Sequence, residues 1–277
     1  MTPAKPFIKW AGGKRRLVPE LMRHVPEDFN GYFEPFLGGG AMFFALAGSG
    51  RLDGADFVWL SDTNAELVNA YNCVQSSLPA VIHRLKSHKE KHCADHYYDV
   101  RSWSPKNLQS IDRAARFIYL NKTCFNGLYR VNKKNKFNVP IGKYKNPKIC
   151  DEDTLRAANQ VMQYPGCEVV CESVEASVKL AQPGDLVYFD PPYIPLNKTS
   201  DFTAYTRDGF TLRDQEDLRD LALNLKSRGV HIILSNSDTA KTSELYSDGF
   251  DLQEVQARRS INSAGSKRGP VGELIIT

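Results

Sequence analysis

Asp190, Pro191, Pro192 and Tyr193 are the residues of this chain best suited to do chemistry. They follow the apolar run 185–189, which predicts a short buried strand. The two prolines stiffen the backbone and remove two N–H donors, while their carbonyl oxygens still accept hydrogen bonds. A carboxylate and a rigid carbonyl are two acceptors for one NH₂ group, and the tyrosine ring can stack on a base. This favours a site for N6 of adenine or N4 of cytosine. Taken alone, the four residues also fit a strand that ends in a proline turn.

A glycine-rich turn near the N-terminus predicts a nucleotide-binding unit. The strand-like residues 32–36 precede the glycines at positions 38–40, which let a ligand approach the backbone closely. The next predicted strand, 57–61, ends at Asp62, where nucleotide-binding units place an acid for the ribose hydroxyls. Phe43 stands where a dinucleotide-binding pattern has its third glycine. The spacing therefore favours an adenosine-containing cofactor other than a nicotinamide dinucleotide.

The net charge of +4 is unevenly distributed along the chain. Of 36 Lys and Arg residues, eight lie between Asn121 and Lys148, where there is no Asp or Glu, so the rest of the chain carries a net charge of −4. Aromatic residues are interleaved with these basic ones. The pattern favours a nucleic-acid surface over an ordinary solvated face, which usually mixes signs. The block consists of Lys122, Arg130, Lys133, Lys134, Lys136, Lys143, Lys145 and Lys148.

The composition fits a soluble globular protein. Of 277 residues, 42% are hydrophobic and 25% are charged. No apolar stretch is long enough for a membrane span, and the first residues lack the apolar core of a signal peptide. The six cysteines are scattered without a C-x-x-C pair, which favours reduced thiols. We expect a cytoplasmic protein without a membrane partner.

Strand-like and helical segments alternate at both ends of the chain, which predicts an α/β fold with a mainly parallel sheet. Further strands are predicted at 167–171, 186–189, 230–234 and 273–276, and a helix at 212–227. The middle of the chain is predicted to be helical, from segments at 63–75, 81–85, 97–100 and 111–120.

Three histidines in this helical region, His88, His92 and His96, are spaced by four residues, as metal ligands on one helix face could be. Lys89, Lys91 and their polar surroundings favour a solvated helix instead. We predict no metal site.

Three motifs together resemble one known family. Residues 9–14 read KWAGGK, residues 34–40 follow the pattern EPF-x-G-x-G, and residues 190–193 read DPPY. In this order they resemble the Dam-type (class alpha) DNA adenine-N6 methyltransferases. Further similarity extends over segments 121–130, 137–142, 202–205 and 259–263.

The resemblance implies a Rossmann-like S-adenosylmethionine-dependent methyltransferase sheet with an inserted helical target-recognition domain. Residues 1–62 and 166–277 would form the catalytic domain, and residues 63–165 the inserted domain. The enzyme would act on double-stranded DNA as a monomer, in a bacterial or phage-infected cell in association with the nucleoid, and would release S-adenosylhomocysteine.

The resemblance also assigns roles to individual residues. The catalytic residues would be Asp190, Pro191, Pro192 and Tyr193. S-adenosylmethionine would be bound by Trp10, Ala11, Gly12, Lys14, Phe36, Gly38, Gly40, Asp62 and Asp190. DNA would be bound by Lys9, Phe125, Asn126, Leu128, Arg130 and Pro140.

Two alternatives to an adenine methyltransferase acting at GATC stay open. An N4-cytosine methyltransferase also presents an amine to an acceptor pair, although such enzymes more often have serine in place of Asp190. A non-enzymatic DNA-binding protein could use the same scaffold, although the intact Lys14, Asp62 and Tyr193 argue against lost activity.

Overall fold

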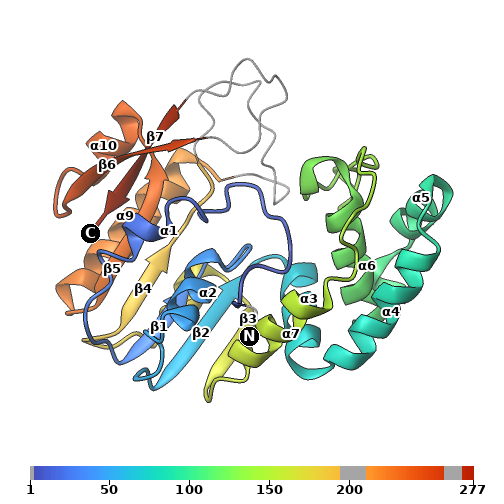
Figure 1. The fold of residues 1–277 in the computed structure, drawn as a ribbon. Helices are drawn as coiled ribbons and strands as arrows, with labels where there is room; N and C mark the ends of the chain where they lie inside the picture. The colour runs from blue at the N-terminus through green and yellow to red at the C-terminus, as the bar shows by residue number, and fades with distance from the viewer. Residues whose placement is uncertain (1–2, 194–209, 259–269) are drawn as a thin grey trace.

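A seven-stranded sheet forms the centre of the computed structural model, which describes residues 3–193, 210–258 and 270–277 (Figure 1). Within these residues the strand order is β3-β2-β1-β4-β5-β7-β6. Strands β1 to β5 are parallel, and β7 is antiparallel to β5 and β6. The bounds are β1 Gly31–Glu34, β2 Phe57–Asp62, β3 Cys167–Cys171, β4 Leu186–Phe189, β5 His231–Ser237, β6 Leu252–Arg258 and β7 Pro270–Ile276.

The inner strands are built from apolar residues because both faces of a parallel sheet are covered. Every residue of β1 and of β4 is buried. The predicted α/β fold class is confirmed, and the predicted strands lie within a few residues of the observed ones. Strand β6 was not predicted, because its alternating polar residues belong to an edge strand that pairs only with β7. The similar segments 202–205 and 259–263 lie outside the described residues.

Helices flank the sheet and form most of the chain between β2 and β3, apart from residues 128–151. Helix α9 starts at a capping box formed by Thr211 and Asp214 and matches the predicted helix. No helix in the described ranges has the length and apolar character that a membrane crossing needs. The bounds are α1 Val18–Leu21, α2 Ala41–Gly48, α3 Ala65–Ser76, α4 Leu78–Glu90, α5 Ala94–Ser102, α6 Ser110–Thr123, α7 Glu152–Met162, α8 Val174–Ser177, α9 Leu212–Ser227 and α10 Ala240–Tyr246, with 3₁₀ turns η1 Pro105–Asn107 and η2 Phe125–Gly127.

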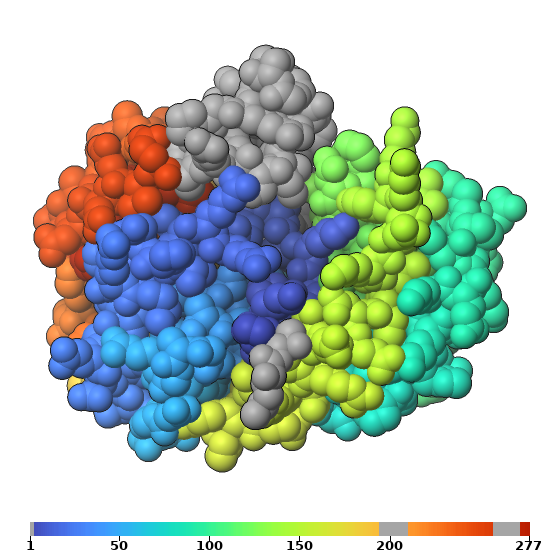
Figure 2. Space-filling view, viewed as in Figure 1, coloured from blue at the N-terminus to red at the C-terminus, as the bar shows by residue number. Residues whose placement is uncertain are grey.

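Helices α4 to α6 lie to one side of the sheet (Figure 1). They are continuous with it, because residues of β2, α3, α4 and α6 belong to one buried apolar cluster. The space-filling view shows the N-terminal segment, in dark blue, between the sheet and the helical part (Figure 2). The division of the chain at residues 63 and 165 into two domains stays a prediction.

The three histidines do not share one helix, since His88 lies on α4, His92 between α4 and α5, and His96 on α5. The expectation of a solvated helix was wrong for His88, whereas His92 and His96 are half-buried. His88 is buried and stacks on the Tyr119 ring at 4.7 Å between ring centroids. Its Nδ1 lies 3.0 Å from Nε2 of His96, and Nδ1 of His92 lies 2.9 Å from the Tyr119 hydroxyl. Burial lowers the pKa of His88 to about 4, so it is neutral at pH 7. In the described part of the chain no group of three or more potential ligands could hold a metal ion.

The chain reverses its direction across the sheet between β1 and β4. From β1 it proceeds outward through β2 to β3, and from β4 it proceeds the other way to β5. The carboxyl ends of β1 and β4 therefore lie side by side with connections leading away in opposite directions, which leaves a crevice where parallel α/β sheets bind ligands.

Glu34 is the last residue of β1 and lies at this crevice with its carboxyl group buried. The Tyr32 hydroxyl and the Phe43 backbone N–H both donate to its Oε2, at 2.7 and 2.9 Å. Burial raises the pKa of Glu34 to about 8, against the effect of these two hydrogen bonds, and the nearby Asp190 adds to the rise. The folded protein therefore holds this proton more tightly than the unfolded chain does.

The substitution Glu34→Gln should change how stability depends on pH. Ionisation of Glu34 opposes folding, so its contribution to the free energy of unfolding falls as the pH rises from about 5 to about 8. Glutamine keeps an acceptor for both donors but does not titrate. Urea unfolding across this pH range should show the variant gaining stability relative to the wild-type protein as the pH increases. A difference that is constant with pH would contradict the raised pKa.

Candidate functional site

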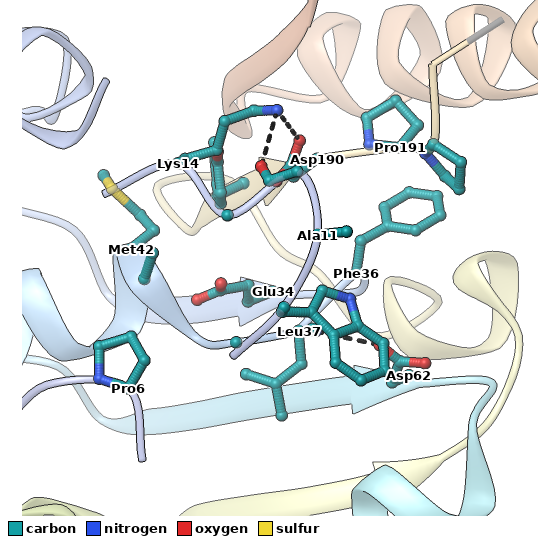
Figure 3. Close-up of a pocket in the computed structure, with 18 of the residues that line it drawn as sticks. Pro6, Ala11, Lys14, Glu34, Phe36, Leu37, Met42, Asp62, Asp190 and Pro191 are labelled. Carbon is teal, nitrogen blue, oxygen red and sulfur yellow. Dashed lines mark hydrogen bonds and ion pairs between the residues drawn. The ribbon is translucent and has the colours of Figure 1, made fainter. Parts of the chain in front are cut away.

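A cavity of about 600 Å³ opens at the carboxyl ends of β1, β2 and β4 (Figure 3). All four predicted catalytic residues line it. Of the predicted cofactor residues, only Gly40 is absent from the lining; it forms the N-cap of α2 with a positive φ of 67°. In the close-up, Glu34 lies between the Lys14–Asp190 pair and Asp62. The structure therefore brings the N-terminal motifs and the D-P-P-Y segment together in one cavity.

Gly38 is the tightest point of the glycine turn. Its φ is +47°, and a Cβ atom there would lie 2.7 Å from the indole ring of Trp10. Its N–H donates to Oδ2 of Asp62 at 3.0 Å, and its carbonyl accepts from the Tyr71 hydroxyl at 3.2 Å. A side chain at position 38 would displace Trp10, so glycine here lets Trp10 lie against the turn.

Asp62 joins the end of β2 to the glycine turn. Besides the Gly38 N–H, its carboxylate accepts the backbone N–H of Asn64 at 2.9 Å. Burial raises the pKa of Asp62 to about 6, and these two hydrogen bonds limit the rise. The residue thus shapes the turn in addition to lining the cavity, a role that the sequence had not indicated.

Asp190, directly after β4, is held through one of its two carboxylate oxygens. Oδ1 lies 2.9 Å from Nζ of Lys14 and accepts a hydrogen bond from the Ser235 hydroxyl at 3.0 Å. The Tyr188 hydroxyl lies 3.0 Å from the same Ser235 oxygen. Burial raises the pKa of Asp190, whereas Lys14 and Ser235 favour the ionised form. Within the described residues Oδ2 makes no hydrogen bond and is left for a ligand.

Lys14 is the buried cation of the cavity, with 4% of its side chain exposed. Burial opposes its charge, but Asp190, Tyr193 and Glu273 outweigh this effect and raise the pKa of Lys14 above its ordinary value. Its Nζ donates to the Tyr193 hydroxyl and lies 4.2 Å from the centre of that ring. One face of the Tyr193 ring is therefore covered by an ammonium group.

The predicted DNA-binding residues gather around the turn η2. Phe125 is 44% exposed, and its N–H donates to the carbonyl of Pro140 at 2.9 Å. Asn126 has a positive φ of 55°, and Leu128 and Arg130 follow in extended backbone or loop. The predicted DNA-binding residues of this region therefore lie within segment 121–148, which also contains the basic block. The hydrogen bond from Phe125 to Pro140 joins the two parts of this segment.

Lys9 is fixed to this turn by contacts that the sequence did not reveal. The side chain of Asn121 accepts the Lys9 N–H at 2.7 Å and donates to the Lys9 carbonyl at 2.6 Å. A Cβ atom on Gly127 would lie 2.5 Å from the Cβ of Lys9. The Lys9 ammonium lies 3.9 Å from the centre of the Tyr144 ring. Lys9 also lines the cavity, so it lies between the cavity and the basic block.

Arg130 is oriented by a neighbour in the hairpin that follows η2. Its Nε donates to Oδ1 of Asn138 at 2.8 Å, and its backbone carbonyl accepts from the Asn138 N–H at 3.1 Å. A bridge between Val131 and Phe137 closes this hairpin, with Lys133 and Lys134 at its tip. The hydrogen bond occupies Nε of the guanidinium group, and the two terminal nitrogens have no hydrogen bond to the described residues.

Sequence reasoning missed Glu34, Asn121 and Ser235 as parts of the site. Each is a buried polar residue. Such a residue needs a buried hydrogen-bond partner, so its presence was a signal that a site lies nearby. The partners are distant in sequence and could not be identified from it.

Comparisons with known proteins agree with this geometry. The family model described as D12 class N6 adenine-specific DNA methyltransferase matches residues 10–261. The chain is 42% identical to the type II methyltransferase M1.LlaDCHI of Lactococcus lactis subsp. cremoris, over 99% of this chain and 95% of that protein. It is 40% identical to the type II methyltransferase M.MjaIII of Methanocaldococcus jannaschii, over 98% of each chain. It is 37% identical to the DNA adenine methylase of Vibrio cholerae, over 99% of this chain and 96% of that protein.

The expected family is thereby confirmed, since both the family model and the relatives cover nearly the whole chain. The same match makes the chain an enzyme of the methyltransferase class and removes the non-enzymatic alternative. This protein belongs to the D12 class of N6 adenine-specific DNA methyltransferases.

Proposed function

We propose that this protein transfers a methyl group from S-adenosylmethionine to N6 of an adenine that is flipped out of double-stranded DNA, within the sequence GATC. The observation that carries the proposal is the arrangement of Asp190. Its Oδ1 is held by Lys14 and Ser235 while Oδ2 has no partner among the described residues, at the edge of a cavity that also contains the glycine turn.

The cavity fits S-adenosylmethionine by size and by chemistry. Its volume of about 600 Å³ lies in the usual range for small-molecule sites. Trp10 and the Gly38 turn offer a flat surface and a close backbone approach, and Asp62 has the place of an acid that accepts ribose hydroxyls. Asp190 is an acid suited to a cationic centre, whereas Glu34, with its pKa raised to about 8 by burial, is mostly protonated at pH 7. When bound, S-adenosylmethionine supplies an electrophilic methyl group on a sulfonium.

Asp190 and Pro191 would act on the amine of the adenine. The amine is a weak nucleophile because its lone pair is delocalised into the ring. Hydrogen bonds from its two N–H groups to Asp190 Oδ2 and to the Pro191 carbonyl would localise the lone pair on nitrogen. They would also stabilise the positive charge that develops on N6. The Lys14 ammonium favours the ionised carboxylate that this role needs.

The adenine must leave the duplex to reach Asp190, which costs a few kcal/mol of stacking and pairing. Since Lys14 covers one face of the Tyr193 ring, the base would stack on the other. Phe125, which is 44% exposed and donates its N–H to the Pro140 carbonyl, would fill the gap left in the duplex. Stacking of the flipped base on Tyr193 and of Phe125 between the remaining bases would lower the free-energy cost of flipping.

The helical segment 63–165 would serve as the target-recognition domain, with the basic block and the hairpin around Lys133 and Lys134 against the phosphates. In the hairpin, Arg130 would read guanine through its two terminal nitrogens, which match O6 and N7 in the major groove. Lys9 and Asn126 would contact the neighbouring bases, with Leu128 and Pro140 against the base edges. We propose that the enzyme acts as a monomer, because these segments and the cavity belong to one chain.

The substitution Asp190→Ala should abolish methyl transfer, because it removes one of the two acceptors of the amine, and it should also lower the stability of the fold, because it leaves the buried Lys14 without its carboxylate partner. Asp190→Asn should be less damaging, since its carbonyl still accepts. The purified proteins should be incubated with S-adenosylmethionine and plasmid DNA from a methylation-free host, and the modified bases mapped. N6-methyladenine at GATC is expected with the wild-type protein, a smaller amount with Asp190→Asn and none with Asp190→Ala. Activity of the alanine variant within about tenfold of wild type would contradict this mechanism, and N4-methylcytosine would overturn the assignment of the base.

The substitution Arg130→Ala should relax sequence preference at one base pair. A bidentate arginine–guanine contact contributes about 1–3 kcal/mol of discrimination, so the preference should fall by roughly five- to a hundredfold. The measurement compares methylation rates on GATC and all its single-base variants for both proteins. If Arg130 contacts a phosphate instead, the relative rates will stay the same and affinity will fall on every sequence.

DNA affinity should fall steeply with salt concentration. If about five of the basic side chains touch phosphates, the slope of log K against log salt is roughly −4 to −5. Replacing both exposed hairpin lysines, Lys133 and Lys134, by alanine should bring the slope closer to zero by about two. The exposed Lys241 on α10 provides the control, since its replacement should leave the slope unchanged. A wild-type slope near −1 would mean that the block is an ordinary solvated face.

A further inference from the structure

In the segment from Asp190 to Pro192, the two prolines cannot hold themselves in place through backbone donors of their own. Both prolines lack an N–H group, so only carbonyl oxygens remain there to make backbone hydrogen bonds. Their φ angles are fixed, and the direction of the Pro191 carbonyl depends on the rotation between the two prolines. Donors from outside the segment must therefore set this direction.

Gln215 of α9 supplies such a donor. Its Nε2 donates to the Pro192 carbonyl at 3.1 Å. Its Oε1 accepts from Asn236 Nδ2 at 3.0 Å and from the Tyr246 hydroxyl at 3.3 Å. Gln215 has no exposed surface. The orientation of its amide is determined, because the Pro192 carbonyl can only accept and the Tyr246 hydroxyl and Asn236 amide both donate.

Strand β5 fixes the segment at both ends. Ser235 and Asn236 are adjacent on this strand, so their side chains point to opposite faces of the sheet. Ser235 donates to Asp190 on one face, and Asn236 holds Gln215 on the other. The segment thus has one contact at Asp190 and another at Pro192, with the Pro191 carbonyl between them.

We propose that Gln215 is a positioning residue for methyl transfer: by holding the Pro192 carbonyl, it aims the Pro191 carbonyl at the adenine amine. This inference rests on the proposed function of Asp190 and Pro191. Gln215 does not contact the substrate. Its loss should therefore slow the chemical step and leave the binding of DNA and S-adenosylmethionine nearly unchanged.

Two variants of Gln215 test the role of its donor. Gln215→Leu removes the donor and should slow single-turnover methyl transfer by about tenfold at every pH, with dissociation constants for DNA and S-adenosylmethionine within about threefold of wild type. Gln215→Glu can donate only while its carboxyl is protonated. Its rate relative to wild type should be close to one at low pH and fall at least about tenfold as the carboxyl ionises. Tyr246 and Arg219, which lies near Tyr246, are the titratable groups facing this position.

Tyr246→Phe is the matched control, because it removes a buried hydrogen bond to Gln215 on the side away from Pro192. Its methyl-transfer rate should stay within about twofold of wild type even where its melting temperature falls as much as that of Gln215→Leu. Fluorescence of 2-aminopurine at the target position, which reports base flipping, should be the same in all variants.

Two results would overturn the inference. One is that the rates of Gln215→Leu and Tyr246→Phe fall alike, in proportion to lost stability. The other is that Gln215→Glu follows the wild-type rate at every pH. Failure of the proposed function is a separate result, since it would appear as a wild-type protein that does not methylate adenine.

Discussion

The buried contact between Lys14 and Asp190 is the interaction on which the site depends. It joins the N-terminal segment to the end of β4 at 2.9 Å, in a place where neither charge could remain without a partner. Removing one member of such a pair leaves an uncompensated charge in a medium of low polarity. The pair therefore fixes the N-terminal segment across the crevice, and the Lys14 ammonium favours the ionised form of Asp190 against the effect of burial.

The N-terminal segment serves three parts of the site within six residues. Lys9 is fixed near the turn η2 through Asn121, Trp10 lies on the glycine turn, and Lys14 contacts Asp190. A shift of this segment would disturb η2, the glycine turn and the Asp190 carboxylate together. The K-W-A-G-G-K motif is therefore in contact with both the glycine turn and the D-P-P-Y segment, although it is distant from both in sequence.

The acids of the cavity serve different purposes because their surroundings differ. Glu34 receives two donors on one oxygen and has a pKa of about 8, whereas Asp62 accepts two backbone N–H groups and has a pKa of about 6. Asp190 alone has a buried ammonium beside it. Burial raises all three pKa values, and the partner of each carboxylate decides how far. A cationic ligand would meet carboxylates that differ in how readily they ionise.

The sequence by itself determined the parts of this protein that depend on neighbours along the chain. The buried strands, the glycine turn at Gly38, helix α9 and the D-P-P-Y segment follow from local apolar patterns, backbone freedom and the stiffness of proline. Only the tertiary structure decided which oxygen of Asp190 is held, that Gln215 reaches Pro192, and that His88 is buried against Tyr119. The polar edge strand β6 likewise could not be predicted from its own residues, because it is defined by its pairing with β7. These features arise from contacts between segments far apart in sequence. A buried polar residue requires a hydrogen-bond partner, but the sequence does not identify which residue that partner is.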